Sequence, residues 1–179
     1  VGAAEPPARV SRNATLYALT GLANTAAWRE TLRSEIERSE RTGAPFTVVF
    51  IDVDGLKSVN DRGGHAAGDE LLASVAECLR LGVRRCDTVA RVGGDEFMIA
   101  LPDTTRAAAE AMMDRLHRES PASFSVGVAQ RRPDEGPASL VERADAEMYR
   151  RKRRRAAEAA EAADAAARAE SEQRPHRVG

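Results

Sequence analysis

The sequence of 179 residues contains only two cysteines and no long apolar run. Cys78 and Cys86 lack the spacing of a metal or redox site, which favours reduced, structural thiols and a cytoplasmic location. No stretch is long enough to span a bilayer, and no signal peptide is recognisable. The chain begins with valine rather than methionine, so we expect an upstream sensory or dimerisation region.

A large charge of one sign is also absent, because the formal net charge is −1. This balance argues against general affinity for nucleic acid or anionic membranes. The length suits one domain with a sizeable core and short appendages. We expect a linker at residues 1–14, one domain at 15–155, and an Ala/Glu/Arg-rich extension at 156–179. The extension has no leucine seam and is expected to be solvated.

The most informative run is Arg91-Val-Gly-Gly-Asp-Glu-Phe97. It lies between a β-branched run at residues 88–90 and an apolar run at 97–101, which predicts a hairpin whose turn carries carboxylates. Glycine at both turn positions permits positive φ and the close approach of a backbone or a phosphate. Taken alone, an ordinary Gly-Gly hairpin with solvated acids explains the run equally well.

A second acidic cluster follows a continuous apolar run at residues 46–51, which predicts a buried central strand. The run ends in Asp52-Val53-Asp54. Two carboxylates at a strand end repel each other unless a cation or a positively charged partner offsets them. Magnesium takes oxygen ligands, often one or two carboxylates completed by substrate phosphates and water. The alternative is a solvated strand end.

Apolar periodicity predicts the remaining elements and a mixed α/β (α+β) fold in the order βααββαβ. A short helical turn should carry Lys57 and Asn60, and Asp69 should open a long helix. Further helices are expected at residues 25–41, 105–117 and 139–155, and a further strand at 124–129.

Six motifs occur in order along the chain: Leu19-Thr-Gly-Leu-Ala-Asn24, Asp52-Val-Asp-Gly-Leu-Lys57, residues 60–69, Gly93-Gly-Asp-Glu-Phe97, residues 124–129 and residues 144–152. With these motifs the chain resembles the GGDEF-domain family, the diguanylate cyclases that join two GTP molecules into cyclic di-GMP. The resemblance implies a ferredoxin-like palm flanked by helices, similar to the palm domains of nucleotidyl cyclases and polymerases. It also implies a homodimer, in which each chain supplies half of the site.

The resemblance implies a role for each matching residue. Magnesium, or manganese in its place, would be held by Asp52, the carbonyl of Val53, and Asp95. Asp95 or Glu96 would take the proton of the attacking hydroxyl, and Lys57 would stabilise developing charge. The GTP-binding positions would be Asn60, His65, Asp69, Gly93, Gly94 and Lys152. Asp54 is interpreted as a structural carboxylate.

The two lysines give independent support to this assignment. Of the 27 basic residues only Lys57 and Lys152 are lysine, and both match the family's phosphate-contacting positions. A compact ammonium and a planar guanidinium are not interchangeable against a triphosphate. At Asp69, a carboxylate accepts hydrogen bonds from N1–H and the exocyclic amine of guanine, which favours GTP over ATP. The alternative is that Asp69 caps its helix.

Product inhibition is a further expectation, because family members subject to it carry Arg-x-x-Asp just before the double glycine. Arg84 and Asp87 match that motif, and Arg115 aligns with a further arginine of the inhibitory site. Such a cluster could clamp cyclic di-GMP. The alternative is a surface ion pair that contributes little. Arg131-Arg-Pro-Asp134 also fits the pattern, but it lies at another position and is assigned no role.

The chain departs from the family pattern at four places. Tyr17 and Thr25 stand where the family has an acid and a base, so the N-terminal turn must be held differently. The stretch between Arg115 and Phe124 is short, which predicts a missing edge strand. The family's arginine after the closing lysine is absent, and Arg155 or a neighbour is a candidate replacement. Leu56 stands where phenylalanine is common.

The sequence therefore predicts a magnesium-dependent diguanylate cyclase domain that acts as a homodimer on GTP. The alternative from another class is a catalytically weak GGDEF domain that binds GTP or cyclic di-GMP as a regulatory module. Intact Asp52, Asp95, Glu96 and Lys57 favour the enzyme, because a receptor has no need of them.

Overall fold

The computed structural model describes residues 16–172, so the expected linker at 1–14 and the end of the extension at 173–179 lie outside the described residues. Its four strands form one antiparallel sheet in the order β2-β3-β1-β4. The strands are β1 (Phe46–Val53), β2 (Thr88–Arg91), β3 (Glu96–Pro102) and β4 (Phe124–Gln130). The helices are α1 (Thr25–Thr42), α2 (Leu56–Gly82), α3 (Arg106–Glu119) and α4 (Pro137–Glu172). The expected mixed α/β order βααββαβ is confirmed from β1 to β4.

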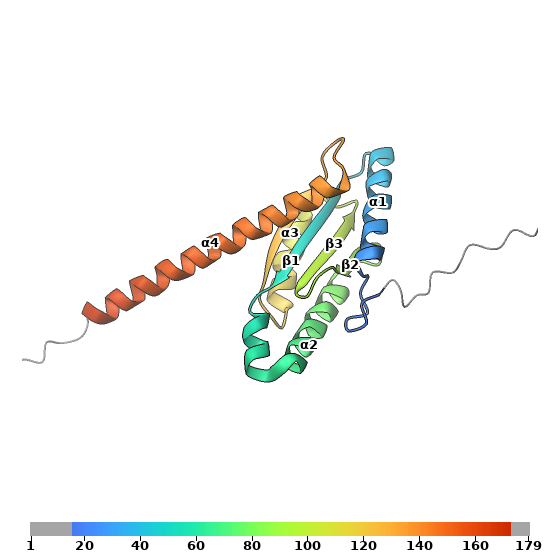
Figure 1. Ribbon diagram of the computed structural model, residues 1–179. Coiled ribbons are helices and arrows are strands. Elements are labelled where there is room, and N and C mark those ends of the chain that lie inside the picture. Colours follow the sequence, from blue (N-terminus) through green and yellow to red (C-terminus); the bar gives the residue numbers. More distant parts are fainter. Residues whose placement is uncertain (1–15, 173–179) are drawn as a thin grey trace, which may run out of the picture.

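Both faces of the sheet are buried, which explains why the strands read as continuous apolar runs rather than alternating ones. On one face, Val49 and Ile51 of β1 pack with apolar residues of α2 and α3. On the other face, Val48 and Phe50 pack with α1 and α4. Figure 1 shows the helices arranged around the sheet in this way. This double covering fixes β1 in the middle of the domain, and with it the positions of Asp52 and Val53 at the end of the strand.

Helix α2 begins earlier than expected and contains a kink. Gly64 has φ 77° and ψ 174°, a conformation that only glycine adopts readily, and it divides α2 into a short first part and a long second part. The expectation that Asp69 opens the long helix is wrong, because helix resumes at residue 65 and Asp69 lies beyond its first turn. A capping role for Asp69 is therefore excluded.

Helix α4 packs closely on β4 because Gly127 has no side chain. A Cβ atom there would collide with the carbonyl oxygen of Ala144 and the amide nitrogen of Met148. The helix then continues beyond the expected end at 155 and projects past the sheet (Figure 1). Its side chains at 156–158 are exposed, as expected for a solvated extension.

Two smaller expectations concern the edge of the sheet and the membrane. In the described part of the chain, no strand lies between the end of α3 and the start of β4, so the expected absence of an edge strand is confirmed. None of the described helices combines the length and the apolar character needed to cross a bilayer.

Candidate functional site

The two acidic motifs meet at one end of the sheet. The register of β1 and β3 pairs Asp52 with Glu96, and the amide of Val53 donates to the carbonyl oxygen of Asp95 at 3.0 Å. This pairing places the end of the central strand beside the glycine turn between β2 and β3. The carboxylates of two motifs that lie far apart in the sequence therefore occupy neighbouring positions.

Lys152 of α4 reaches this acidic edge. Its ammonium group contacts the carboxylate of Asp52 and lies 3.8 Å from that of Asp54. The hydrogen bond to Asp52 raises the pKa of Lys152, although partial burial opposes the rise. Because the Lys152 side chain is still 44% exposed, its charge remains accessible to a ligand that approaches from solvent. This geometry places one of the two lysines at the candidate site.

Asp54 is held by the start of β4. Its carboxylate accepts hydrogen bonds from the hydroxyls of Ser125 at 3.0 Å and Ser123 at 3.4 Å. Its amide donates to the carbonyl of Ser123 at 3.0 Å. A carboxylate with this many partners fixes the loop between β1 and α2, which supports its interpretation as a structural residue.

The two turn glycines differ in what surrounds them. Neither uses positive φ, so the left-handed conformation that their sequence permits is not adopted. A Cβ atom on Gly93 would collide with the carboxylate of Glu96, which folds back over the turn. A Cβ atom on Gly94 would meet nothing within 4 Å. A side chain at Gly93 would displace the Glu96 carboxylate, whereas Gly94 leaves open space.

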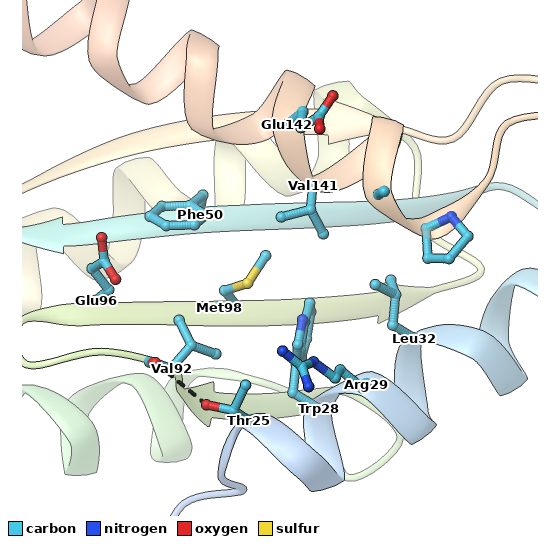
Figure 2. Close-up of a pocket in the computed structure, with 12 residues that line it drawn as sticks. Thr25, Trp28, Arg29, Leu32, Phe50, Val92, Glu96, Met98, Val141 and Glu142 are labelled. Carbon is cyan, nitrogen blue, oxygen red and sulfur yellow. Dashed lines mark hydrogen bonds between the residues drawn. The ribbon is translucent and has the colours of Figure 1, made fainter.

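Glu96 is the acid whose environment disfavours charge most clearly. Burial raises its pKa first, followed by repulsion from Asp95, Asp52 and Asp145. Glu96 also closes one end of a largely apolar hollow of about 500 Å³ between α1 and α4, which Phe50 and Met98 help to line (Figure 2). A half-buried carboxylate surrounded by three others marks a place where added positive charge would be favourable.

The donor set fits a magnesium ion that is completed by a substrate. Within the described residues, no three side chains of His, Cys, Asp or Glu gather in an arrangement that could hold a metal by themselves. Magnesium commonly uses only one or two protein carboxylates together with phosphate oxygens and water. Asp52, the carbonyl of Val53 and Asp95 match this pattern. Burial, and then repulsion from Asp95, Asp52 and Asp145, raises the pKa of the neighbouring Glu96, so several carboxylates face one another at this edge.

The proposed guanine-reading residues are brought together by the kink in α2. Asn60 lies in the first part of the helix, and a Cβ atom on Gly68 in the second part would collide with its side-chain oxygen. That oxygen, Oδ1, is buried and has no hydrogen-bond partner. Asp69, the next residue after Gly68, is exposed, as is His65. The kink therefore places an unsatisfied acceptor close to an accessible carboxylate.

Lys57, the second lysine, lies in the first turn of α2. Its side chain is exposed, and it forms no salt bridge within the part of the chain that the structure describes. It stands a short distance along the chain from Asp54, on the helix that follows the acidic strand end. It is therefore free to meet a ligand that binds at this end of the sheet.

The residues of the expected inhibitory site also lie near one another. The amide of Arg84 donates to the carboxylate of Asp87 at 2.7 Å, and Arg115 of α3 donates to the carbonyl of Gly82 at 2.7 Å. A hollow of about 370 Å³ adjoins this loop and is lined by Arg80, Arg84 and Asp87, among others. Arg84 and Asp87 thus line this hollow, whereas Arg115 pairs with Glu119 and the carbonyl of Gly82 and is not among its lining residues.

Sequence reasoning assigned no role to two residues that the structure brings into the site. Arg91 is 6% exposed and donates to the carbonyls of Gly93 and Gly94. Asp145 of α4 lies near enough to contribute to the raised pKa of Glu96. Asp145 belongs to the motif at residues 144–152, and Arg91 directly precedes the segment that leads into Gly93-Gly-Asp-Glu-Phe97. An arginine at the end of a buried strand was the available signal for Arg91.

Comparison with known proteins gives a consistent result. Residues 14–158 match the family model described as "Diguanylate cyclase, GGDEF domain". Diguanylate cyclase DgcP of Pseudomonas aeruginosa is 37% identical over 147 residues, which cover 75% of this chain and 22% of DgcP. Probable diguanylate cyclase DgcC of Escherichia coli is 30% identical over 162 residues, which cover 84% of this chain and 44% of DgcC. The chain thus spans less than half the length of these curated relatives.

Solved structures agree with this match. The GGDEF domain of DgcB from Caulobacter crescentus, crystallised in complex with c-di-GMP, has a TM-score of 0.77 and 28% identity, with 84% of this chain and 94% of that chain covered. Diguanylate cyclase SiaD of Pseudomonas aeruginosa, in complex with its activator SiaC, has a TM-score of 0.75 and 34% identity, with 80% and 60% covered. The family model, the relatives and the shared fold together show that this chain belongs to the GGDEF-domain family of diguanylate cyclases.

Proposed function

We propose that this domain condenses two GTP molecules into cyclic di-GMP and two pyrophosphates, with magnesium as cofactor and a homodimer as the active form. The observation that carries this proposal is the meeting of Asp52 and Val53 with Asp95 and Glu96 at one end of the sheet. Lys152 adds a positive charge at the same edge. The named relatives are diguanylate cyclases, and c-di-GMP is bound in the DgcB structures.

The reaction requires two equivalent transfers. The 3′-oxygen of one GTP attacks the α-phosphorus of the other, a new P–O bond forms, and the bond to the β-phosphate breaks to release pyrophosphate. The hydroxyl proton must leave during attack, and the carboxylate of Asp95 or Glu96 accepts it. The raised pKa of Glu96 suits that residue to hold a proton. A bound magnesium ion supplies charge neutralisation to the triphosphate.

The chain's own residues account for substrate binding in this proposal. Lys152 and Lys57 pair with phosphate oxygens, and the open space at Gly94 admits a phosphate near the turn backbone. Asp69 accepts from N1–H and the amine of guanine. The Asn60 side chain, whose Oδ1 is buried against Gly68, contacts the base after it reorients. His65 stands at the start of the same helical segment and is a further residue proposed to contact GTP.

Two finer proposals concern the neighbouring arginines. Product binds in the hollow beside Arg84 and Asp87 and thereby inhibits the domain, with Arg115, which donates to the carbonyl of Gly82, as a further contact. Arg155 replaces the arginine that is missing after Lys152. Its guanidinium donates to the carbonyl of Phe124 at 3.4 Å, next to the Ser123 that holds Asp54, and so it lies near the expected phosphate position.

The test uses the domain fused to a parallel coiled coil, so that dimer formation does not limit activity. The protein is incubated with GTP and magnesium, and the products are separated by chromatography. We expect cyclic di-GMP and pyrophosphate, and a loss of at least roughly 100-fold in Asp95→Asn. Asp114→Asn, an exposed acid on α3, serves as the matched control and should retain full activity.

Other outcomes separate the alternatives. A dimeric domain that binds GTP or cyclic di-GMP tightly but forms no product would identify a binding module instead. A product made from another nucleotide would overturn the substrate assignment. For the inhibitory site, Arg84→Ala should relieve inhibition by added product without changing the initial rate, and equal inhibition of both proteins would contradict that part of the proposal.

A further inference from the structure

Arg91 is a buried cation whose main partners are carbonyl groups of the glycine turn. It is the last residue of β2, and its side chain donates from Nε to Gly93 at 3.2 Å and from a terminal nitrogen to Gly94 at 2.6 Å. Within the described residues it forms no salt bridge with a carboxylate. Burying a guanidinium without a carboxylate is costly. The two-pronged contact fixes both carbonyls that precede Asp95 and Glu96.

Tyr17 covers the other side of the same guanidinium. The Cζ atom of Arg91 lies 4.8 Å from the centre of the Tyr17 ring, a distance at which a cation is attracted to an aromatic face. Tyr17 itself begins a tight turn in which its amide donates to Leu22 at 2.8 Å. The sequence left open how this turn is held without the family's acid and base, and the stacked Arg91 provides the answer.

Two further bonds tie the same N-terminal segment to the turn. The amide of Arg91 donates to the carbonyl of Ala23 at 2.9 Å. The hydroxyl of Thr25, the first residue of α1, donates to the carbonyl of Val92 at 3.3 Å (Figure 2). Thr25 stands where the family has a base, and its hydroxyl supplies this contact instead. The segment from Tyr17 to Thr25 therefore contacts the two residues directly before the glycine turn.

We propose that Arg91 is a positioning residue that holds the turn carrying Asp95 and Glu96, and that Tyr17 couples this hold to the segment preceding α1. The proposal rests on the proposed function, because it assigns the turn a catalytic role. A movement of the segment at Tyr17 changes the stacking on Arg91, and Arg91 transmits the change to the carbonyls of Gly93 and Gly94. Input that reaches the N-terminal side of the domain thereby acts on the catalytic carboxylates without any movement of the sheet.

The test measures amide hydrogen exchange in the domain without nucleotide, together with kcat and KM for GTP in the dimeric form. The amides of Val92 and Gly93 both donate to the carbonyl of Glu96, so their exchange reports opening of the turn. Arg91→Lys keeps the charge but loses the planar fork. Tyr17→Leu removes the aromatic face, and Tyr17→Phe retains it as the matched control.

We expect Arg91→Lys and Tyr17→Leu to speed exchange at these two amides by at least about tenfold while the β1 amides stay protected. The value of kcat should fall by about tenfold with KM changed less than twofold, because neither side chain is placed against the base or the phosphates. Tyr17→Phe should match the unmodified domain in both measurements.

Unchanged exchange and kcat in Arg91→Lys would overturn the positioning role. Unchanged exchange in Tyr17→Leu would overturn the coupling, and this variant decides that point even if Arg91→Lys folds poorly, since Tyr17 lies at the partly exposed margin. A domain without cyclase activity would overturn the proposed function, whereas the exchange comparison would still decide whether Arg91 holds the turn.

Discussion

The ammonium group of Lys152 contacts the carboxylate of Asp52, a residue 100 positions earlier in the chain. In the absence of substrate, the lysine thus neutralises the acid that is proposed to bind magnesium. The same side chain is proposed to pair with the phosphates of GTP. When GTP and a divalent cation bind together, the phosphates can pair with Lys152 and the cation with the carboxylate of Asp52. The two binding events are therefore expected to be coupled.

Lys152→Met is therefore expected to have opposite effects on two ligands. GTP should bind more weakly, with KM raised about tenfold, because a phosphate contact is lost. A divalent cation alone should bind the free domain more tightly, because the competing ammonium is removed from Asp52. Steady-state kinetics and cation titration by calorimetry measure the two effects. Arg150→Met, an exposed neighbour on α4, is the matched control, and weaker cation binding in Lys152→Met would contradict this picture.

Glu96→Gln is expected to stabilise the cation-free domain while it weakens catalysis. The pKa of Glu96 is raised in the folded state by burial and by nearby carboxylates, so ionisation costs stability once the pH rises above its unfolded value. Glutamine removes that cost at neutral pH. The gain is at most about 1 kcal/mol after solvent screening, or roughly 2–4 °C in Tm.

The stability advantage of Glu96→Gln should depend on pH in a defined direction. Below the unfolded pKa both states of the parent domain are protonated, so the advantage of Glu96→Gln should shrink as the pH is lowered toward 4. Thermal unfolding at several pH values without divalent cation provides the measurement. Glu70→Gln, at an exposed position of α2, should show no such trend. A stability advantage of Glu96→Gln that grows at acidic pH would contradict a raised pKa of Glu96 in the folded domain.

Gly127→Ala is expected to displace α4 from the sheet. The added methyl group would meet the backbone of Ala144 and Met148, which cannot rotate away as a side chain can. Overpacking of this kind costs about 1–3 kcal/mol. Because Lys152 lies further along the same helix, KM for GTP should also rise. Chemical denaturation and kinetics test both effects against Gly136→Ala, where an added Cβ meets nothing within 4 Å. Equal stability of the two variants would contradict the close packing of α4 on β4.

Asp69→Asn is expected to weaken base selection without loss of stability. The residue is exposed inside α2 and caps no helix end, so its replacement should change the free energy of unfolding by less than about 0.5 kcal/mol. Inosine triphosphate lacks the exocyclic amine of guanine and isolates one of the proposed hydrogen bonds. The preference for GTP over inosine triphosphate should fall by about tenfold or more. Glu70→Gln again provides the control, and an unchanged preference would remove Asp69 from the guanine site.

Local patterns predicted the elements that depend on local physics. The apolar run of β1, the glycine hairpin and the helix expected at residues 25–41 were all confirmed, because the local sequence of each segment determines its conformation and burial. The predicted start of the long helix at Asp69 was wrong. Aspartate is a good capping residue, which favoured a helix start there, but the non-helical conformation of Gly64 sets the actual boundary.

Local sequence patterns could not predict the tertiary contacts that complete the candidate site. Asp54 is held by two serines about 70 positions away, and Arg91 stacks on Tyr17 from a different part of the fold. Neither pair has a spacing that sequence reading could detect. The resemblance indicated which acids to propose as functional, but it could not show how the departures at Tyr17 and Thr25 are compensated. That answer required the tertiary structure.

The bend at Gly64 has a consequence for fidelity. Asn60 and Asp69 stand on opposite sides of this residue, so the relative position of these two proposed guanine-binding residues depends on its φ and ψ. Under the proposed function, discrimination among nucleobases then depends partly on the conformation of the helix. A substitution at Gly64 that changes its φ and ψ is then expected to change which base is accepted, although every hydrogen-bonding group is retained.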